Sequence, residues 1–318
     1  MRSRLLRNIL SAGMAGWSFL SVCLSSQSED SAPPIVLTSV APIADLVKRV
    51  AGGDAKVVQL IPDGQDAHTF EPPPSGAKAF TQAGLVIFNG LDLEESLLKM
   101  VKASVPARTP VVLLAESTVQ PKERIVDRRE QGNPHVWMNP IFAGRYAEAI
   151  RDELSRVDPG HASGYKQRAQ KLLRQLDALD KASAAAVRSI PAGHRKLVTY
   201  HDSWSYFTRQ YGMTLIAAIQ PASFLEPSAQ EVAAIVQQVK QTGVPAIFGS
   251  EVFSSPVLET IGRETGVRYV DTLRDDVLPG APGDPEHSYV GMMVENVKTL
   301  VSALGGDPKL LDEVSLSD

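Results

Sequence analysis

The fold of this chain is decided by residues 158–193, which read DPGHASGYKQRAQKLLRQLDALDKASAAAVRSIPAG. Asp158 and Pro159 are typical of a helix start, and Pro191 and Gly193 end the helical pattern. Apolar residues recur every three or four positions between them, at Tyr165, Ala169, Leu172, Leu176, Leu179, Ala182, Ala186 and Ile190. A helix of roughly thirty residues would be about 45 Å long, enough to span two lobes and pack against both.

Short apolar strands alternate with helices on both sides of this segment. The predicted strands are 35–40, 56–61, 85–89 and 111–115 before it, and 196–200, 214–219, 246–249 and 268–270 after it. The predicted helices include 41–51, 94–103, 140–156, 228–242, 255–265 and 288–304. Such alternation is typical of parallel sheets covered on both faces. The sequence therefore predicts an α/β protein with two lobes, each a mostly parallel sheet flanked by helices, joined by one long rigid helix.

These patterns set the expected domain limits. The N-terminal lobe should cover 35–157, the linking helix 158–192 and the C-terminal lobe 193–318. A helical connection resists bending more than loose strands do, so we expect a small hinge motion between the lobes.

The first residues have the pattern of an export signal. Arg2, Arg4 and Arg7 precede an apolar stretch over 9–24, which is short for a membrane span. We therefore expect a signal peptide over 1–28, a flexible tether over 29–34 and a periplasmic protein. The single cysteine, Cys23, ends the apolar stretch and offers a lipoprotein anchor as an alternative.

Composition excludes several classes of protein. One cysteine among 318 residues allows neither a disulfide framework nor a cysteine-built zinc site. The chain has 32 Lys and Arg against 36 Asp and Glu. This balance is not that of a nucleic-acid-binding protein, which needs an excess of basic residues.

Three histidines lie where α/β sheets bind ligands, at or beyond the carboxyl ends of strands. His68 follows a turn-rich loop, His135 precedes a predicted helix, and His201 ends a predicted strand. Glu251 and Asp271 also follow strands. Each residue alone has an ordinary structural explanation. No short metal-binding spacing such as H-E-x-x-H is present that would connect them into a metal site.

Six motifs in order resemble one family and connect these residues. They are HTFEPPPS (68–75), NGLDLE (89–94), NPHVWMNP (133–140), YHDSWSYF (200–207), EPSAQE (226–231) and SYVGMM (288–293). The sequence is similar to the solute-binding proteins of bacterial zinc and manganese ABC importers, the ZnuA/TroA-like or cluster A-I family. The resemblance covers about residues 35 to 305.

The resemblance implies a metal site between the lobes and a function in import. Its ligands would be His68, His135, His201 and Asp271, with Asp275 and Asp276 as nearby alternatives to the last. Three imidazoles and one carboxylate suit Zn²⁺, whereas Mn²⁺ prefers more oxygen ligands. The expected protein is a monomer that is not an enzyme, captures Zn(II) and delivers it to an inner-membrane ABC permease.

Other functions remain open from the sequence. The same fold could bind Mn(II) or Fe(II), or act as a metal-dependent surface adhesin. An exported zinc hydrolase with Glu251 as general base is disfavoured, because four protein ligands leave no open position for water. The segment 116–132 contains no histidine, unlike the long histidine-rich loop of many zinc members.

Overall fold

Eight parallel strands form two four-stranded sheets in the computed structural model, which describes residues 32–73, 77–126, 132–220, 228–250 and 256–316. The first sheet has the order β2-β1-β3-β4 and the second β6-β5-β7-β8. Their bounds are β1 (Ile35–Thr38), β2 (Lys56–Gln59), β3 (Leu85–Phe88), β4 (Val111–Leu113), β5 (Lys196–His201), β6 (Thr214–Gln220), β7 (Ala246–Phe248) and β8 (Arg268–Val270). The two lobes thus share one strand order. In each lobe the second strand lies on one side of the first strand, and the third strand lies on its other side.

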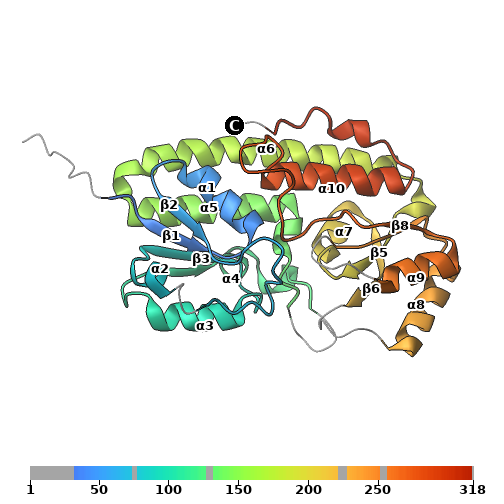
Figure 1. Ribbon diagram of the computed structural model, residues 1–318. Coiled ribbons are helices and arrows are strands. Elements are labelled where there is room, and N and C mark those ends of the chain that lie inside the picture. The colour runs from blue at the N-terminus through green and yellow to red at the C-terminus, as the bar shows by residue number, and fades with distance from the viewer. Residues whose placement is uncertain (1–31, 74–76, 127–131, 221–227, 251–255, 317–318) are drawn as a thin grey trace, which may run out of the picture. The chain divides into compact units, whose positions relative to one another are not determined.

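Helices cover both sheets. The first lobe carries α1 (Ala41–Ala51), α2 (Ala77–Thr81), α3 (Glu95–Ser104), α4 (Leu114–Thr118) and α5 (Pro140–Val157). The second carries α7 (Ser205–Tyr211), α8 (Ala229–Thr242) and α9 (Pro256–Thr265). Figure 1 shows α1 and α5 on one side of the first sheet and α2 and α3 on the other. The predicted α/β architecture of two parallel-sheet lobes is confirmed.

All eight predicted strands are present, and five of them (β1, β2, β3, β4 and β7) end one or two residues earlier than expected. Leu114 and Ala115 belong to α4 instead of the strand predicted over 111–115. The backbone N–H of Ala115 donates to the Asn89 carbonyl at 2.8 Å, so the chain leaves the sheet into a helical turn at once. The apolar pattern of 111–115 could not distinguish a buried strand from the start of a buried helix.

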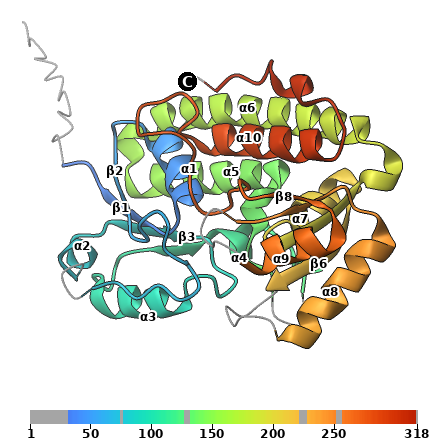
Figure 2. The same cartoon turned by 45° about the vertical axis from the view of Figure 1, so that its right-hand side comes forward.

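One long helix runs along both lobes. Helix α6 (Ala162–Ser189), preceded by a 3₁₀ turn at Pro159–His161, has 28 residues and a length of about 42 Å. It packs against α1 and α5 on the first lobe and against α7 on the second. Figure 2 shows it extending past both sheets. The predicted linking helix is confirmed.

The last helix returns to the first lobe. Helix α10 (Tyr289–Ala303) lies beside α6 in both views and contacts α1 as well (Figures 1 and 2). The backbone N–H of Tyr289 donates to the Asp45 carboxylate of α1 at 2.8 Å. A short 3₁₀ turn at Pro308–Leu311 then packs on α6 and α10.

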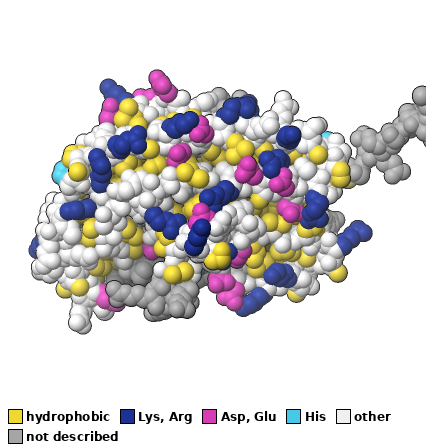
Figure 3. All heavy atoms as spheres, turned by 180° about the vertical axis from the view of Figure 1, so that it is seen from behind, with side chains coloured by type: hydrophobic (Ala, Val, Ile, Leu, Met, Phe, Trp, Pro, Cys, Tyr) yellow, Lys and Arg dark blue, Asp and Glu magenta, His cyan; other side chains and the backbone are white. Residues whose placement is uncertain are grey.

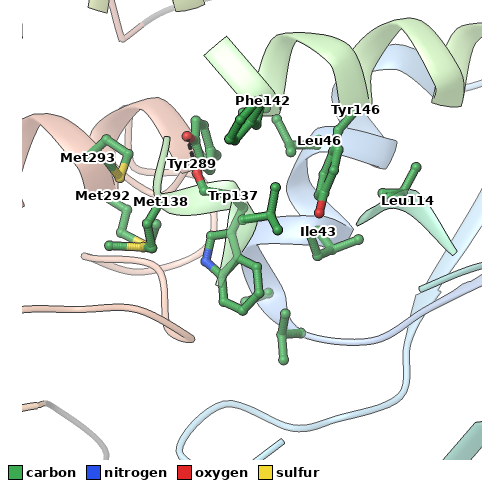
Figure 4. Close-up of a cluster of buried hydrophobic side chains, with 14 of the residues drawn as sticks. Ile43, Leu46, Leu114, Trp137, Met138, Phe142, Tyr146, Tyr289, Met292 and Met293 are labelled. Carbon is green, nitrogen blue, oxygen red and sulfur yellow. Dashed lines mark hydrogen bonds between the residues drawn. The ribbon is translucent and has the colours of Figure 1, made fainter. Parts of the chain in front are cut away.

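Consequently, one hydrophobic core includes residues from both halves of the chain. It combines the first sheet with α6, α7 and α10, whereas a smaller core lies between the second sheet, α8 and α9. Figure 4 shows Trp137 and Met138 among side chains of α1, α5 and α10. The Trp137 carbonyl accepts the Tyr289 hydroxyl at 2.6 Å, and the Trp137 indole N–H donates to the Asp275 carbonyl at 3.0 Å.

The surface has mixed charge. Figure 3 shows Lys and Arg side chains interspersed with Asp and Glu side chains over one face. In the described part of the chain, no helix is both long and apolar enough to cross a membrane.

Replacing the Tyr289 hydroxyl tests the link between α10 and the first lobe. Tyr289→Phe keeps the fully buried ring and leaves the Trp137 carbonyl without this donor. We expect the free energy of unfolding to fall by about 1–2 kcal/mol, measured by denaturant titration. Tyr269→Phe, at a partly exposed ring of β8, should change it by less than about 0.5 kcal/mol; equal effects would contradict this account.

Candidate metal centre

Three histidines converge from three parts of the fold. His68 lies in the loop after β2, His135 lies just before the 3₁₀ turn Val136–Met138, and His201 is the last residue of β5. His135 and His201 are 2% and 8% exposed, and His68 is half-buried. They are separated by up to 133 positions in the sequence, since His68 and His201 are the outer pair.

The three imidazoles are close enough to share one ion. One ring nitrogen from each lies within 4.8 Å of the others. The Nε2 atoms of His135 and His201 are 3.1 Å apart. The ring centroid of His68 is 5.5 Å from that of His135 and 5.4 Å from that of His201.

This spacing fits a tetrahedral ion. Zinc–nitrogen bonds of about 2.0–2.1 Å at tetrahedral angles separate two ligand nitrogens by about 3.3 Å. The separation between the Nε2 atoms of His135 and His201 is close to that value. A small inward movement of His68 would complete a three-nitrogen site.

Asn133 sets the protonation of His135. Its side-chain Oδ1 lies 3.1 Å from His135 Nδ1 and also accepts the His135 backbone N–H at 3.0 Å. An amide oxygen only accepts, so we assign the ring proton to Nδ1. The lone pair of Nε2 then points toward the other imidazoles, which is the tautomer that binds a metal.

The same side chain connects His135 to the second lobe. The Asn133 amide nitrogen donates to the Asp202 carbonyl at 2.7 Å, one residue beyond His201. The Tyr206 hydroxyl donates to the Asn133 carbonyl at 3.0 Å. One amide thus holds the loop of His135 against the end of β5.

Burial favours the neutral form of His68 and His135. Desolvation, followed by the nearby His201, lowers the pKa of His68 from 6.5 to about 4, and Asp66 acts in the opposite direction. Desolvation also lowers the pKa of His135 well below its usual value, with smaller contributions from His201 and His68. Neutral imidazoles are the form that coordinates a cation, so the site is ready to bind at neutral pH.

A carboxylate turn positions His68. Asp66 Oδ1 accepts the His68 backbone N–H at 2.9 Å, and Asp66 Oδ2 accepts the Thr69 hydroxyl at 2.6 Å. These bonds form an Asx turn that fixes the loop just before the imidazole.

The predicted acidic ligand lies outside the histidine group. Asp271 follows β8, is exposed and is not part of the set within 4.8 Å. Strand β7 lies between β8 and β5, so these two strands are about 10 Å apart. Asp271 and His201 therefore lie at the same carboxyl edge of the sheet but two strands apart. Asp275 is 5% exposed, and Asp276 is partly buried.

Two predictions concern residues that the structure does not describe. They are the segment 1–28, which includes Cys23, and Glu251. In contrast, sequence reasoning missed Asn133 as a functional side chain. The available signal was its position two residues before a candidate ligand, where an Asn side chain can accept the backbone N–H of that ligand.

The comparisons with known proteins agree with this geometry. Residues 36–303 match the family model described as zinc-uptake complex component A, periplasmic. The chain belongs to this family. Its members are solute-binding proteins for metal transport and not enzymes, so the chain is a metal-transport binding protein.

Relatives with different metals in their names match nearly the whole chain. The zinc-binding protein TroA of Treponema pallidum is 28% identical over 308 residues, which are 96% of this chain and 99% of TroA. The manganese-binding lipoprotein MntA of Halalkalibacterium halodurans is 28% identical over 277 residues, 87% of this chain and 90% of MntA.

Solved structures of similar proteins have the same fold as this chain. The structure of Treponema pallidum TroA matches with a TM-score of 0.79 and 30% identity, over 86% of this chain and 99% of TroA. A manganese-bound periplasmic protein of Candidatus Liberibacter asiaticus shares the fold at 22% identity, with a TM-score of 0.76 over 85% and 99% of the two chains.

Acid should destabilise the metal-free protein through His68. An unfolded chain protonates this imidazole near pH 6.5, whereas the folded protein does so near pH 4, so stability is lost as the pH falls between these values. The contribution is about 3 kcal/mol. His68→Gln should flatten the pH dependence of unfolding in this window, measured by denaturant titration with chelator present. An unflattened His68→Gln profile would contradict the shift.

Asn133→Ala should weaken metal binding. It removes the acceptor from His135 Nδ1 and the donor from the Asp202 carbonyl, and loss of such outer partners typically costs about 10–100-fold in affinity. Competition with a chromophoric chelator measures the change. The matched control is Asn139→Ala, whose amide caps α5 and should reduce stability by about 1 kcal/mol without changing affinity. Equal affinity losses in both variants would show a general folding effect.

Proposed function

We propose that this protein captures Zn(II) outside the cytoplasm and delivers it to an inner-membrane ABC permease. The ion would be coordinated by His68, His135, His201 and Asp271. The observation that carries the proposal is the 3.1 Å separation of two buried imidazole nitrogens, with a third imidazole beside them.

The donor set favours zinc over manganese. Three neutral nitrogens suit Zn²⁺, which accepts nitrogen-rich four-coordination, whereas Mn²⁺ prefers carboxylate and water oxygens. Relatives are named for zinc, manganese and iron, so family membership alone does not choose among these ions. The chemistry of the ligands supplies the choice.

Asp271 supports release as well as binding. Its exposed position at the edge of the second sheet allows it to approach an ion held by the three histidines, if the segment after β8 moves inward. A carboxylate would reduce the net charge of the bound ion and its ligands from about +2 to +1. Withdrawal of this single ligand would then weaken the site without displacing the buried histidines.

The N-terminal residues support an extracytoplasmic location. The segment 1–28 has three arginines before an apolar stretch, as export signals do. MntA is named a lipoprotein, and Cys23 offers the corresponding attachment point here. Incorporation of labelled fatty acid into the wild type but not into Cys23→Ser would support the anchor, and cleavage beyond Cys23 would exclude it.

Direct competition between metals tests the proposed ligand. The purified mature chain, dialysed against equal Zn²⁺ and Mn²⁺, should retain one zinc ion per chain, and His68→Ala and His201→Ala should each lose most of it. Metal content is measured by mass spectrometry. Retention of manganese in preference to zinc would overturn the metal assignment, and binding of neither ion would overturn the function.

Paired acidic variants test the fourth ligand. Asp271→Asn should weaken zinc binding by more than the 10–100-fold expected for loss of an outer partner, while Asp275→Asn should affect folding stability more than affinity. Chelator competition and thermal unfolding measure the two effects. The opposite pattern would assign the carboxylate to Asp275.

A further inference from the structure

A strained turn lies beside the loop of His135. After β3, three consecutive residues have left-handed backbones, with φ of 89° at Gly90, 50° at Leu91 and 63° at Asp92. Glycine adopts this region easily and aspartate does so occasionally, whereas leucine does so only when its surroundings enforce it. Strain of this kind in a packed structure indicates that the turn serves a purpose, because an ordinary connection would avoid it.

A buried carboxylate closes the turn. Glu94 is 3% exposed, and its two oxygens accept the backbone N–H groups of Asn89 and Gly90 at 2.9 and 3.0 Å. The carboxylate of Glu116, in α4, accepts the Leu91 backbone N–H at 2.8 Å. Burial raises the pKa of Glu94 to about 7, against the opposing effect of its hydrogen bonds. An acidic side chain therefore occupies a position where desolvation opposes its ionisation.

The turn places Asn89 against the loop that carries His135. The Asn89 side chain donates to the Pro134 carbonyl at 2.8 Å, one residue before the imidazole. Its oxygen accepts the Tyr146 hydroxyl of α5 at 2.8 Å, so the amide has one fixed orientation. Leu91 of the same turn lies against Gly132, where an added Cβ would be only 3.4 Å from a leucine methyl.

Asn89 also occupies a distinctive place in the sheet. It directly follows β3, which lies beside β1 where the strand order of the first lobe reverses. Ligands of α/β proteins commonly bind at such a point. Here the side chain at that position is buried and bonds the Pro134 carbonyl of the loop that carries His135.

We propose that the turn 89–94 is a positioning device for the metal site, in which Glu94 locks the strained backbone and Asn89 fixes the Pro134 carbonyl and hence the direction of the His135 imidazole. The proposal rests on the proposed function, since it assigns a role to residues around its ligand. Asn133 sets the tautomer of His135 from one side, and Asn89 sets the backbone from the other.

Glu94→Gln tests the device with little change in shape. A Gln side chain has one acceptor and one donor, so one of the two backbone N–H groups would face an amide nitrogen. We expect the affinity for Co²⁺ and Zn²⁺ to fall about 10-fold or more, the visible Co²⁺ absorption bands to shift, and the His135 ring ¹⁵N signals to change. Glu95→Gln, next to it but exposed and paired with Lys99, is the matched control and should behave as the wild type.

Tyr146→Phe provides a second, conservative variant. It removes the hydroxyl that orients the Asn89 amide and should weaken Co²⁺ binding several-fold, with the same spectral direction as Glu94→Gln. It decides the question if Glu94→Gln does not fold.

The outcomes separate this proposal from the proposed function. If the wild type binds neither Co²⁺ nor Zn²⁺, the proposed function fails. If the wild type binds and a folded Glu94→Gln or Tyr146→Phe protein shows unchanged affinity and unchanged His135 signals, the positioning role is wrong. Lower thermal stability without a change in affinity or spectrum also overturns it, because that is the result of a purely structural role.

Discussion

Burial of closely spaced imidazoles opposes their protonation. A protonated ring would lack the water that stabilises a charge, and two protonated rings would repel each other. The lowered pKa values of His68 and His135 express this constraint, since desolvation is the largest cause of both. Each of the three rings places a nitrogen within 4.8 Å of the others, and a cation can accept a lone pair from each of them at once.

Contacts of the chain itself bring the halves of this centre together. Asn133 joins the His135 loop to the residue after His201, and Trp137, two residues beyond His135, bonds to both Asp275 and Tyr289. The core beneath them includes α6 and α10 as well as the first sheet. A site supported in this way does not require the ion to assemble it, which lowers the entropic cost of binding.

Much of the fold could be predicted from local patterns. Strands β1 to β8 and the long helix α6 follow from apolar runs and from periodicity, which depend on neighbours within a few residues. The three histidines were identifiable as strand-end residues, and the family motifs connected them. The functional role of Asn133 could not be predicted this way, because its partners are the neighbouring His135 and the distant Asp202 and Tyr206. Nor could the packing of α10 against α1, which joins residues 244 positions apart.

The sequence by itself determined the two α/β lobes, the connecting helix and the three histidines, because helix periodicity, apolar strands and residue chemistry are properties of short segments. Only the tertiary structure decided that these imidazoles meet within 4.8 Å and that Asp271 stands apart from them. It also decided that Asn89 bonds the Pro134 carbonyl beside His135 and that Glu94 bonds the Asn89 backbone. The physical reason is that distances between remote segments depend on the packing of the whole core. Burial and the pKa values that follow from it are likewise set by that packing.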